Sequence, residues 1–422
     1  MIDIKHLVEN TSLYAQELVK RGKDGALAEK TKQAYLDHKD RQQEFENLRQ
    51  KQNEFNKKVV QLSGEEKQAA IAEMKGLSEQ VKILESETRE LKEALDQLIS
   101  KIPNLTWEGI PVGKSDEDNP VIGTWGTKPV FDGYDPKPYW ELPVYQKYVS
   151  QDDGVKAMGS RGYYMHGQMA WFQKVLFDYA LSQVMKEGFE LFYVPLMLND
   201  TVLTGTGHLP DFDGQQYEVP IDEGKSFYLI GSSEPSIMGY FMDKNLGELE
   251  KPVLATCWSS CFRKEAGSYG KDQQGILRVH QFEKVEMVAI AKPEETEALF
   301  EKFSKIVEGI YSSLGLHFQA VEVCSGDIPH KHRRQKDYEV WFPAVNRFRE
   351  NCSNGNASDY QNRGLRITYN TQDGNRRTPW GLNCTAITFR TGLAILEQYQ
   401  QEDGSVRIPE VLRSAFGKDL LE

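Results

Sequence analysis

The chain has 422 residues, of which 39% are hydrophobic and 27% are charged. These are the proportions of an ordinary globular protein with enough apolar material for a sizeable core, and the length suggests roughly two or three domains. No run of about 18 or more apolar residues occurs, which excludes a membrane-spanning helix. Residues 1–5 lack the basic start and apolar stretch of a signal peptide, so we expect a cytoplasmic protein.

The formal net charge of −12 argues against broad affinity for nucleic acid, because phosphate binding needs local Lys and Arg. Basic residues nevertheless slightly outnumber acidic ones across residues 20–62, whereas residues 63–100 are acidic. A locally basic helix on an acidic protein can grip RNA. From charge alone, a solvated charged helix explains this segment as well.

The first 100 residues predict two long helices. No proline occurs before Pro103, and apolar residues recur at alternating spacings of three and four on both sides of a turn at Gly64. Ser63 and the acids after Gly64 suit a helix start. We therefore predict an antiparallel coiled-coil hairpin of about 50 Å per helix that protrudes as an arm with no third helix covering it, the alternative being two helices of a compact bundle. The seams are Phe45, Leu48, Gln52, Phe55, Val59 and Leu62, then Met74, Leu77, Val81, Leu84, Thr88, Leu91, Leu95 and Leu98.

The rest of the chain mixes helices and strands. Residues 105–135 are rich in Gly, Pro, Asp and Asn and are typical of an irregular linker or entry segment after a helical domain of residues 1–104. Residues 136–422 predict an α+β domain whose largely antiparallel sheet is flanked by helices. The expected helices are residues 168–186, with Trp171 among its apolar positions, then 294–314 and 391–401. The expected strands are residues 189–194, 281–291 and 338–342.

The five cysteines are odd in number and scattered, which is not typical of a disulfide framework. Cys257 and Cys261 lie four apart, but no second pair has the local spacing of a zinc site. We therefore expect buried free thiols and no zinc. The other three are Cys324, Cys352 and Cys384.

Residues 261–286 are the segment most suggestive of chemistry. They predict a strand, a glycine-bearing loop and a second strand. Arg263 on the first strand could present fixed, paired donors to a phosphate, and Phe282 on the second could stack on a base. A charged surface hairpin accounts for the same residues equally well.

This hairpin resembles motif 2 of the class II aminoacyl-tRNA synthetases, in the form found in seryl-tRNA synthetases. The helical hairpin is similar to that family's tRNA-binding arm, and the helix and strand that end at Pro195 resemble motif 1, which implies a homodimer. Residues 389–391 resemble motif 3. Matches in order over the full chain are more specific than any single motif, and the others lie at residues 104–105, 111–113, 119, 204–210, 397–405 and 409–413.

The resemblance implies a serine–tRNA ligase. Such an enzyme activates L-serine with ATP and Mg²⁺ to seryl-adenylate and pyrophosphate. It then transfers serine to the 3′ end of tRNA(Ser), which is bound through the helical arm of the partner subunit. The serine carboxylate is the nucleophile, so the chemistry needs positioning and neutralisation of phosphate charge and no protein base. His208 and His280 are therefore interpreted as structural.

The resemblance also implies the role of each site residue. Arg263 and Arg390 are the catalytic residues because they neutralise charge on the α-phosphate. ATP is bound by Arg263, Glu265, Arg278, Phe282, Glu350, Ser353 and Arg390, with adenine between Phe282 and Arg390 and the magnesium ion on Glu350 and Ser353. Serine is bound by Ser232, Glu234, Arg263, Glu286, Asn383 and Thr385.

The chain departs from the family pattern near the amino-acid pocket. Ser232 stands where the family has Thr, and Gly364 stands where it often has Arg. The segment from Asn383 to Arg390 is one residue short, with Thr385 as the candidate contact to the serine hydroxyl. Asn354 and Gly355 replace a Cys-Ser pair. These changes leave a paralogue that serves another acceptor, or a non-catalytic tRNA-binding protein, as alternatives.

Overall fold

The computed structural model describes residues 1–422 apart from 60–61, 210–213, 223 and 267–273. It divides into an N-terminal unit, Ile2–Pro103, and a C-terminal unit, Asn104–Glu422 together with Met1. Among the described residues, no helix is long and apolar enough to cross a membrane.

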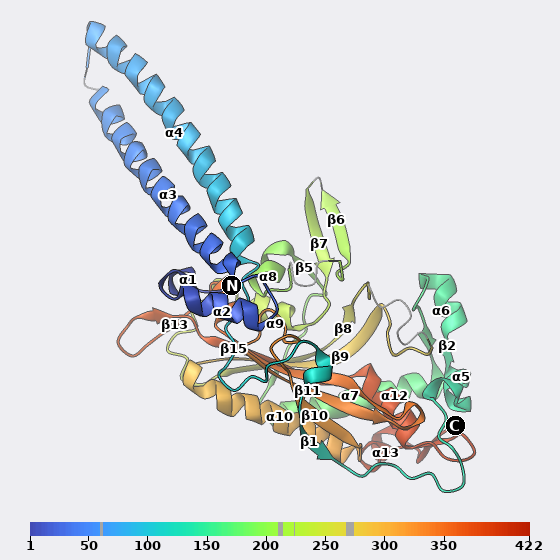
Figure 1. The fold of residues 1–422 in the computed structure, drawn as a ribbon. Coiled ribbons are helices and arrows are strands. Elements are labelled where there is room, and N and C mark those ends of the chain that lie inside the picture. The colour runs from blue at the N-terminus through green and yellow to red at the C-terminus, as the bar shows by residue number, and fades with distance from the viewer. Residues whose placement is uncertain (60–61, 210–213, 223, 267–273) are drawn as a thin grey trace. The chain divides into compact units, whose positions relative to one another are not determined.

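The N-terminal unit contains the predicted hairpin. Helices α3 (Ala26–Val59) and α4 (Gly64–Ile99) run antiparallel and pack on each other along their length (Figure 1). Every described seam residue is buried or half-buried, and the polar seam residue Gln52 donates a 2.8 Å hydrogen bond to Ser78 on the facing helix. Ser63 is the N-cap residue of α4 as predicted, although its side chain makes no cap hydrogen bond. The heptad pattern therefore fixed the pairing of the two helices.

Two short helices were not predicted. Helices α1 (Ile4–Glu9) and α2 (Thr11–Lys20) pack against α3, so the expectation that no further helix covers the hairpin is wrong at its base. Figure 1 shows α3 and α4 continuing beyond α1 and α2 as a two-helix arm. The amphipathic stretch before Ala26 is only one or two turns at a time, which is too short to stand out by periodicity.

The C-terminal unit is built on one large sheet, as the α+β prediction requires. Its strand order is β1-β10-β11-β12-β15-β9-β8-β4, and neighbours pair antiparallel except for β4 and β8, which are parallel. The strands are β1 (Val121–Trp125), β4 (Glu190–Leu191), β8 (Val253–Phe262), β9 (Gln281–Ala291), β10 (Phe318–Glu322), β11 (Arg334–Phe342), β12 (Arg347–Ser358) and β15 (Trp380–Thr388).

Helices cover this sheet on two sides. The larger core joins Val285 and Met287 to residues of α7, α10, α12 and α13, whereas Val288 and Ile290 join a smaller core with α8 and α9. The alternation along β9 follows from the two-residue period of a strand. The helices of this unit are α5 (Pro143–Tyr148), α6 (Gln151–Met158), α7 (Gly167–Lys186), α8 (Asp200–Gly205), α9 (Glu234–Tyr240), α10 (Thr296–Ser313), α11 (Tyr360–Gly364), α12 (Phe389–Gln398) and α13 (Glu410–Phe416).

Small sheets flank the large one. The largest has the order β5-β7-β6, and Figure 1 shows β6 and β7 as a hairpin beside β8. The remaining strands form two-stranded pairs. These pairs are β2 (Val149–Ser150) with β3 (Tyr164–Met165), β13 (Tyr369–Asn370) with β14 (Arg376–Arg377), and β16 (Val406–Arg407) with β17 (Leu420–Leu421). The three-stranded sheet consists of β5 (Met197–Asn199), β6 (Glu218–Asp222) and β7 (Lys225–Leu229).

Three sequence expectations need correction. The stretch 105–135 is not irregular throughout, because β1 within it forms one edge of the large sheet. The strand expected at residues 189–194 is reduced to the two residues of β4, and Tyr193 beyond it is fully exposed. Trp171, expected on the apolar face of α7, is 49% exposed, and neighbouring Phe172 is buried instead. The expected helices and the strands at 281–291 and 338–342 are confirmed, the last within a longer β11.

Gly364 has a structural reason. A Cβ at this position would lie 2.0 Å from the backbone oxygen of Gly205, so α11 and α8 meet backbone to backbone. An arginine here would force the two helices apart. Gly364 therefore differs from the arginine that the family often has because α8 and α11 approach each other closely at this residue.

Candidate functional site

A polar pocket opens over the middle strands of the large sheet. Its lining comes from β9, β11, β12 and β15, from the starts of α9 and α12, from the segment after β8, and from the connection between β10 and β11. Eleven of the twelve predicted site residues line it; Arg278, the twelfth, contacts the pocket residue Glu265. The eleven are Ser232, Glu234, Arg263, Glu265, Phe282, Glu286, Glu350, Ser353, Asn383, Thr385 and Arg390.

Strand β9 places the first charged pair. Lys284 and Glu286 are two residues apart, so their side chains lie on the same face of the sheet. The Lys284 Nζ lies 2.8 Å from Glu286 Oε2 and donates a 2.9 Å hydrogen bond to Ser232 Oγ. Burial by itself lowers the pKa of Lys284, but the Glu286 carboxylate outweighs it and raises that pKa. Lys284 is therefore held in its charged form beside Glu286.

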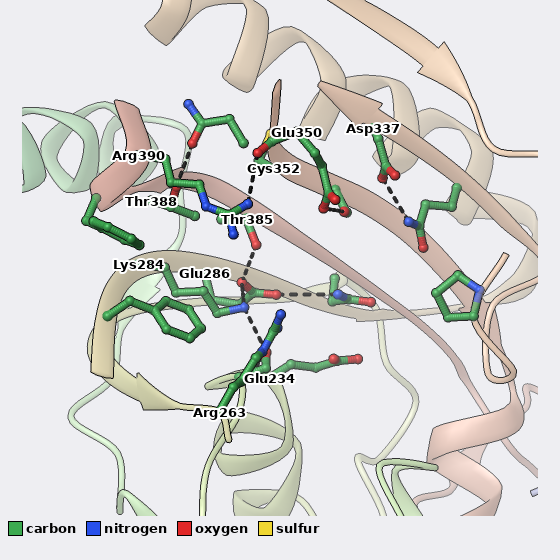
Figure 2. Close-up of a pocket in the computed structure, with 18 of the residues that line it drawn as sticks. Glu234, Arg263, Lys284, Glu286, Asp337, Glu350, Cys352, Thr385, Thr388 and Arg390 are labelled. Atoms are coloured by element: carbon green, nitrogen blue, oxygen red, sulfur yellow. Dashed lines mark hydrogen bonds and ion pairs between the residues drawn. The ribbon is translucent and has the colours of Figure 1, made fainter. Parts of the chain in front are cut away.

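Strand β15 adds two polar side chains to Glu286. Thr385 Oγ1 donates to Glu286 Oε2 at 2.9 Å, and Asn383 Nδ2 donates to Oε1 at 3.4 Å. Figure 2 shows Thr385 and Glu286 pointing toward each other. The strand register shifts between Thr385 and Ile387, a bulge that lies in the segment that is one residue short of the family pattern. Thr385, whose register was in question, thus reaches the pocket.

A second charged pair lies at the start of α9. Glu234 Oε2 accepts a short hydrogen bond from Lys331 Nζ, and Glu234 Oε1 accepts a 2.8 Å hydrogen bond from Gln361. Glu234 and Lys331 are 1% and 5% exposed. Burial raises the pKa of Glu234, but the Lys331 charge outweighs it, so this pKa lies well below its usual range. The carboxylate is ionised and fully paired.

His208 takes part in this pair. Its Nδ1 lies 2.9 Å from Thr206 Oγ1, whose hydroxyl donates to the Val202 carbonyl, so Nδ1 carries the proton. Its Nε2 lies 3.3 Å from Lys331 Nζ and accepts from it. Burial, followed by the Lys331 charge, lowers the pKa of His208 to about 4. His208 is therefore a neutral acceptor at the pocket wall. The other histidine of the sequence analysis, His280, contacts the backbone, with its Nδ1 3.0 Å from the Arg263 carbonyl.

His332 links the two ends of the pocket. Its Nε2 lies 2.8 Å from Asn383 Oδ1 and its Nδ1 lies 2.6 Å from Gln335 Oε1. Gln335 in turn donates a 2.8 Å hydrogen bond to Asp337. Burial and the nearby Lys331 charge lower the pKa of His332 to about 4. A buried chain of side-chain contacts thus runs from Glu286 to Asp337, in which the neutral His332 donates to only one of the two amide oxygens.

Arginines and aromatic rings form the opposite wall. Arg263 donates from Nε to the Gly231 carbonyl at 3.1 Å, and its guanidinium lies 5.2 Å from the centre of the Phe282 ring. Phe282 packs against Phe389, with ring centres 6.2 Å apart. Arg390 donates from Nε to the Leu277 carbonyl at 3.1 Å. Backbone acceptors therefore fix the orientation of both guanidinium groups at the pocket.

Glu265 and Arg278 lie between β8 and β9, Glu265 shortly after the end of β8 and Arg278 shortly before the start of β9. Arg278 Nη1 is 3.2 Å from Glu265 Oε2, and Arg161 lies 3.7 Å from the same oxygen. Glu265 has φ +51°, a left-handed conformation that costs about 1–2 kcal/mol for a residue with a Cβ. The tip of the loop, including Gly267 and Gly270, lies outside the described residues.

Acidic side chains gather near Ser353. Ser353 Oγ donates to Glu350 Oε1 at 3.3 Å, and Asp337 faces Ser353 in the register of β11 and β12. Burial and the Glu350 charge raise the pKa of Asp337 well above its usual range. Within the described residues, no group of three or more His, Cys, Asp or Glu could hold a metal by itself. This sparse oxygen set suits Mg²⁺, which keeps waters and shares substrate phosphates.

Comparison with known proteins gives the family. The profile of the seryl-tRNA synthetase N-terminal domain matches residues 1–106, and that of the tRNA synthetase class II core domain (G, H, P, S and T) matches residues 217–399. A serine–tRNA ligase from Aliarcobacter butzleri is 38% identical over 98% of this chain and 99% of that protein. The chain belongs to the seryl-tRNA synthetase family.

Structural and further sequence comparisons agree with this family. A seryl-tRNA synthetase from Pyrococcus horikoshii, complexed with ATP, is 31% identical with a TM-score of 0.88 and covers 100% of this chain and 99% of that one. A serine–tRNA ligase from Rhodococcus jostii is 35% identical over 100% of both chains. The fold, with its helical arm and antiparallel class II core, is thus that of the seryl-tRNA synthetase family throughout.

Several pocket residues were missed by the sequence analysis. Lys284 could have been found, because it alternates with Phe282 and Glu286 along a predicted strand. Lys331, His332, Gln335 and Asp337 carried no such signal. Lys331 and His332 lie in a connection without periodicity, and their partners are distant in sequence. All five cysteines are buried and free, as expected.

The buried His332 ring predicts a pH dependence of stability. Its pKa is about 4 in the folded protein and about 6.5 in an unfolded chain, so the unfolded state binds more protons between these values and stability falls as pH falls. Lowering the pH from about 7.5 to about 5.0 should remove about 2 kcal/mol through this group. His332→Gln should lose correspondingly less.

Denaturant unfolding followed by tryptophan fluorescence measures this effect, because all seven tryptophans lie in the C-terminal unit. The exposed His166→Gln is the matched control and should behave as wild type. Equal pH dependence in wild type and His332→Gln would contradict the assignment.

Proposed function

We propose that this chain is a serine–tRNA ligase that forms seryl-adenylate from L-serine and ATP and then esterifies tRNA(Ser). One observation carries the proposal. In a chain of the seryl-tRNA synthetase family, two backbone-anchored arginines and the buried Phe282 ring face a small polar pocket built on Glu286 and Thr385. In one cavity, these residues offer complementary groups to a phosphate, to a nucleobase and to a small ligand that carries a hydroxyl.

Adenylation requires positioning more than proton transfer. The serine carboxylate oxygen attacks the α-phosphorus, the new bond forms to that oxygen, and the bond to pyrophosphate breaks with the electron pair leaving on pyrophosphate. Arg263 and Arg390 are the catalytic residues in this proposal, since fixed guanidinium donors stabilise charge on the α-phosphate. The neutral His208 is a poor candidate for a base because both of its nitrogens are engaged.

ATP binding is assigned to the wall that carries the aromatic rings. Adenine stacks on Phe282 with Arg390 on its other face, Glu265 contacts the adenine amino group, and Arg278 holds the γ-phosphate. Arg278 now pairs with Glu265, so its guanidinium must reorient or be shared when a phosphate arrives. A strained loop start at Glu265 supports such a rearrangement.

Magnesium is assigned to Glu350 and Ser353. When bound, the ion would neutralise phosphate charge. Burial first and the Glu350 charge second raise the pKa of Asp337, and a cation at this place would neutralise the Glu350 charge. The residues present therefore fit the ion, with most of its ligands supplied by ATP and water.

Serine is assigned to the two charged pairs and their neighbours. Thr385 and Asn383 fix Glu286, which can accept from the serine hydroxyl or ammonium, and Glu234 beside Ser232 offers a second carboxylate. Alanine lacks the hydroxyl and would forgo the hydrogen bond to Glu286, which disfavours it. The shift from Thr to Ser at Ser232 removes one methyl group from this pocket.

The remaining assignments concern tRNA and assembly. Residues 1–104 form the arm domain that binds tRNA(Ser), residues 105–135 the entry segment, and residues 136–422 the catalytic domain. A homodimer in which the arm serves the partner subunit is supported by large apolar side chains exposed around motif 1, since such patches mark interfaces. They include Trp171, Met185, Leu191, Tyr193 and Met197. A role in charging tRNA with cellular ATP places the protein in the cytoplasm.

Arg263→Ala should reduce serine-dependent ATP–pyrophosphate exchange by at least about 100-fold, because it removes a donor to the transition-state phosphate. Filter binding of tRNA(Ser) should change little. The control is Arg376→Ala, an exposed arginine on β14 outside the pocket. Exchange that persists near the wild-type rate in Arg263→Ala would refute the phosphate assignment.

Graded shortening of the arm should separate seryl-adenylate formation from the transfer of serine to tRNA. Arg41 and Glu87 face each other across the hairpin at 3.5 Å, and Gln52 faces Ser78 at 2.8 Å, so each pair marks a place for a new turn. Replacing residues 42–86 by a short Gly-Ser turn should spare exchange and abolish tRNA charging.

Replacing only residues 53–77 shortens the same hairpin at its outer part and gives the intermediate variant. Charging should fall with arm length while exchange stays constant across the series. Full charging by the shorter of the two variants would remove the arm from the proposed mechanism.

A further inference from the structure

The end of the pocket that is assigned to serine already contains two ammonium groups, those of Lys284 and Lys331. Glu286 is paired with Lys284 and Glu234 is paired with Lys331, and each of these four side chains is no more than 7% exposed. Every full negative charge at this end is therefore matched before any amino acid binds. An incoming α-amino acid brings a third ammonium group.

A third buried ammonium cannot simply be added. An ionised group taken out of water without a partner costs several kcal/mol, so the substrate ammonium needs a carboxylate. Figure 2 shows Glu234 and Glu286 near Arg263 and Thr385, whereas Glu350 and Asp337 lie apart from them. One of the two lysines must therefore release its carboxylate when an amino acid binds.

The two lysines differ in their freedom to move. Lys284 projects from the interior of β9 and is held by both Glu286 and Ser232. Lys331 lies in the connection between β10 and β11, outside any helix or strand. Its ammonium contacts Glu234 and the neutral acceptor His208. Lys331 is thus the lysine that can withdraw with least disturbance of the sheet.

We propose that Lys331 is a specificity-determining residue that occupies Glu234 in place of the substrate ammonium and is displaced by it. The exchange keeps Glu234 paired throughout, since one ammonium replaces another, and the released Lys331 gains water. Only a ligand that carries its own ammonium can drive the exchange. The inference rests on the proposed function in assigning this end of the pocket to the amino acid.

Direct binding tests the proposal without requiring catalysis. The probes are seryl-sulfamoyl-adenosine, an adenylate analogue, and its counterpart with hydrogen in place of the ammonium group. The adenosine part supplies affinity common to both. Calorimetry measures both Kd values. The Kd of the counterpart without the ammonium group, divided by the Kd of seryl-sulfamoyl-adenosine, reports what the ammonium contributes to binding. In Lys331→Met this ratio should rise at least about tenfold over wild type, because Glu234 is no longer occupied.

Lys336→Met is the matched control. Lys336 is also buried and ion-paired, with its Nζ 3.0 Å from Glu301, but it does not line the pocket. Its ratio should equal that of wild type. An unchanged or smaller ratio in Lys331→Met would overturn the proposal.

Lys331→Gln provides a second variant that keeps a donor for Glu234 without the charge, and its ratio should also rise. If neither variant folds, Lys331 is a fixed structural ion and the proposal fails. Loss of serine-dependent exchange in wild type would refute the serine assignment alone, because the Kd ratios are still measured.

Discussion

Pairing of buried charge is the constraint on which this site depends. Strand β9 carries apolar residues into two cores and then, on one of the same faces, presents Lys284 and Glu286 beneath the pocket. Charged groups survive there only because each finds a partner: Lys284 with Glu286, Lys331 with Glu234. The pocket is therefore preorganised by its own ions, and ligands must exchange with them.

The same constraint explains how the pocket is divided. Guanidinium groups held by backbone carbonyls stand beside Phe282 on one wall, while Glu350 and Ser353 supply oxygen ligands on another. A polyanion with its cation suits these two walls, and a small zwitterion suits the lysine–glutamate pairs. His332 spans the region between them through Asn383 and Gln335.

Local patterns predicted much of this structure. Heptads gave the α3–α4 hairpin, alternation gave β9, and the family motifs gathered eleven predicted side chains in one pocket. Prediction failed where the deciding contact is distant in sequence. β1 is a strand only because β10 pairs with it, and Lys331 matters only because Glu234, 97 residues away, needs a counter-charge. No periodicity encodes such pairings, so they emerge only from the folded chain.

Serine-dependent ATP–pyrophosphate exchange by the wild-type protein, with threonine, alanine, glycine and cysteine in parallel, tests the central claim most directly. The account predicts exchange with serine and little with the other four, because Glu286 and Thr385 form a small pocket that requires a hydroxyl. Exchange with a different amino acid would mean that the altered pocket has changed substrate. Exchange with none of the five would contradict the proposed chemistry altogether.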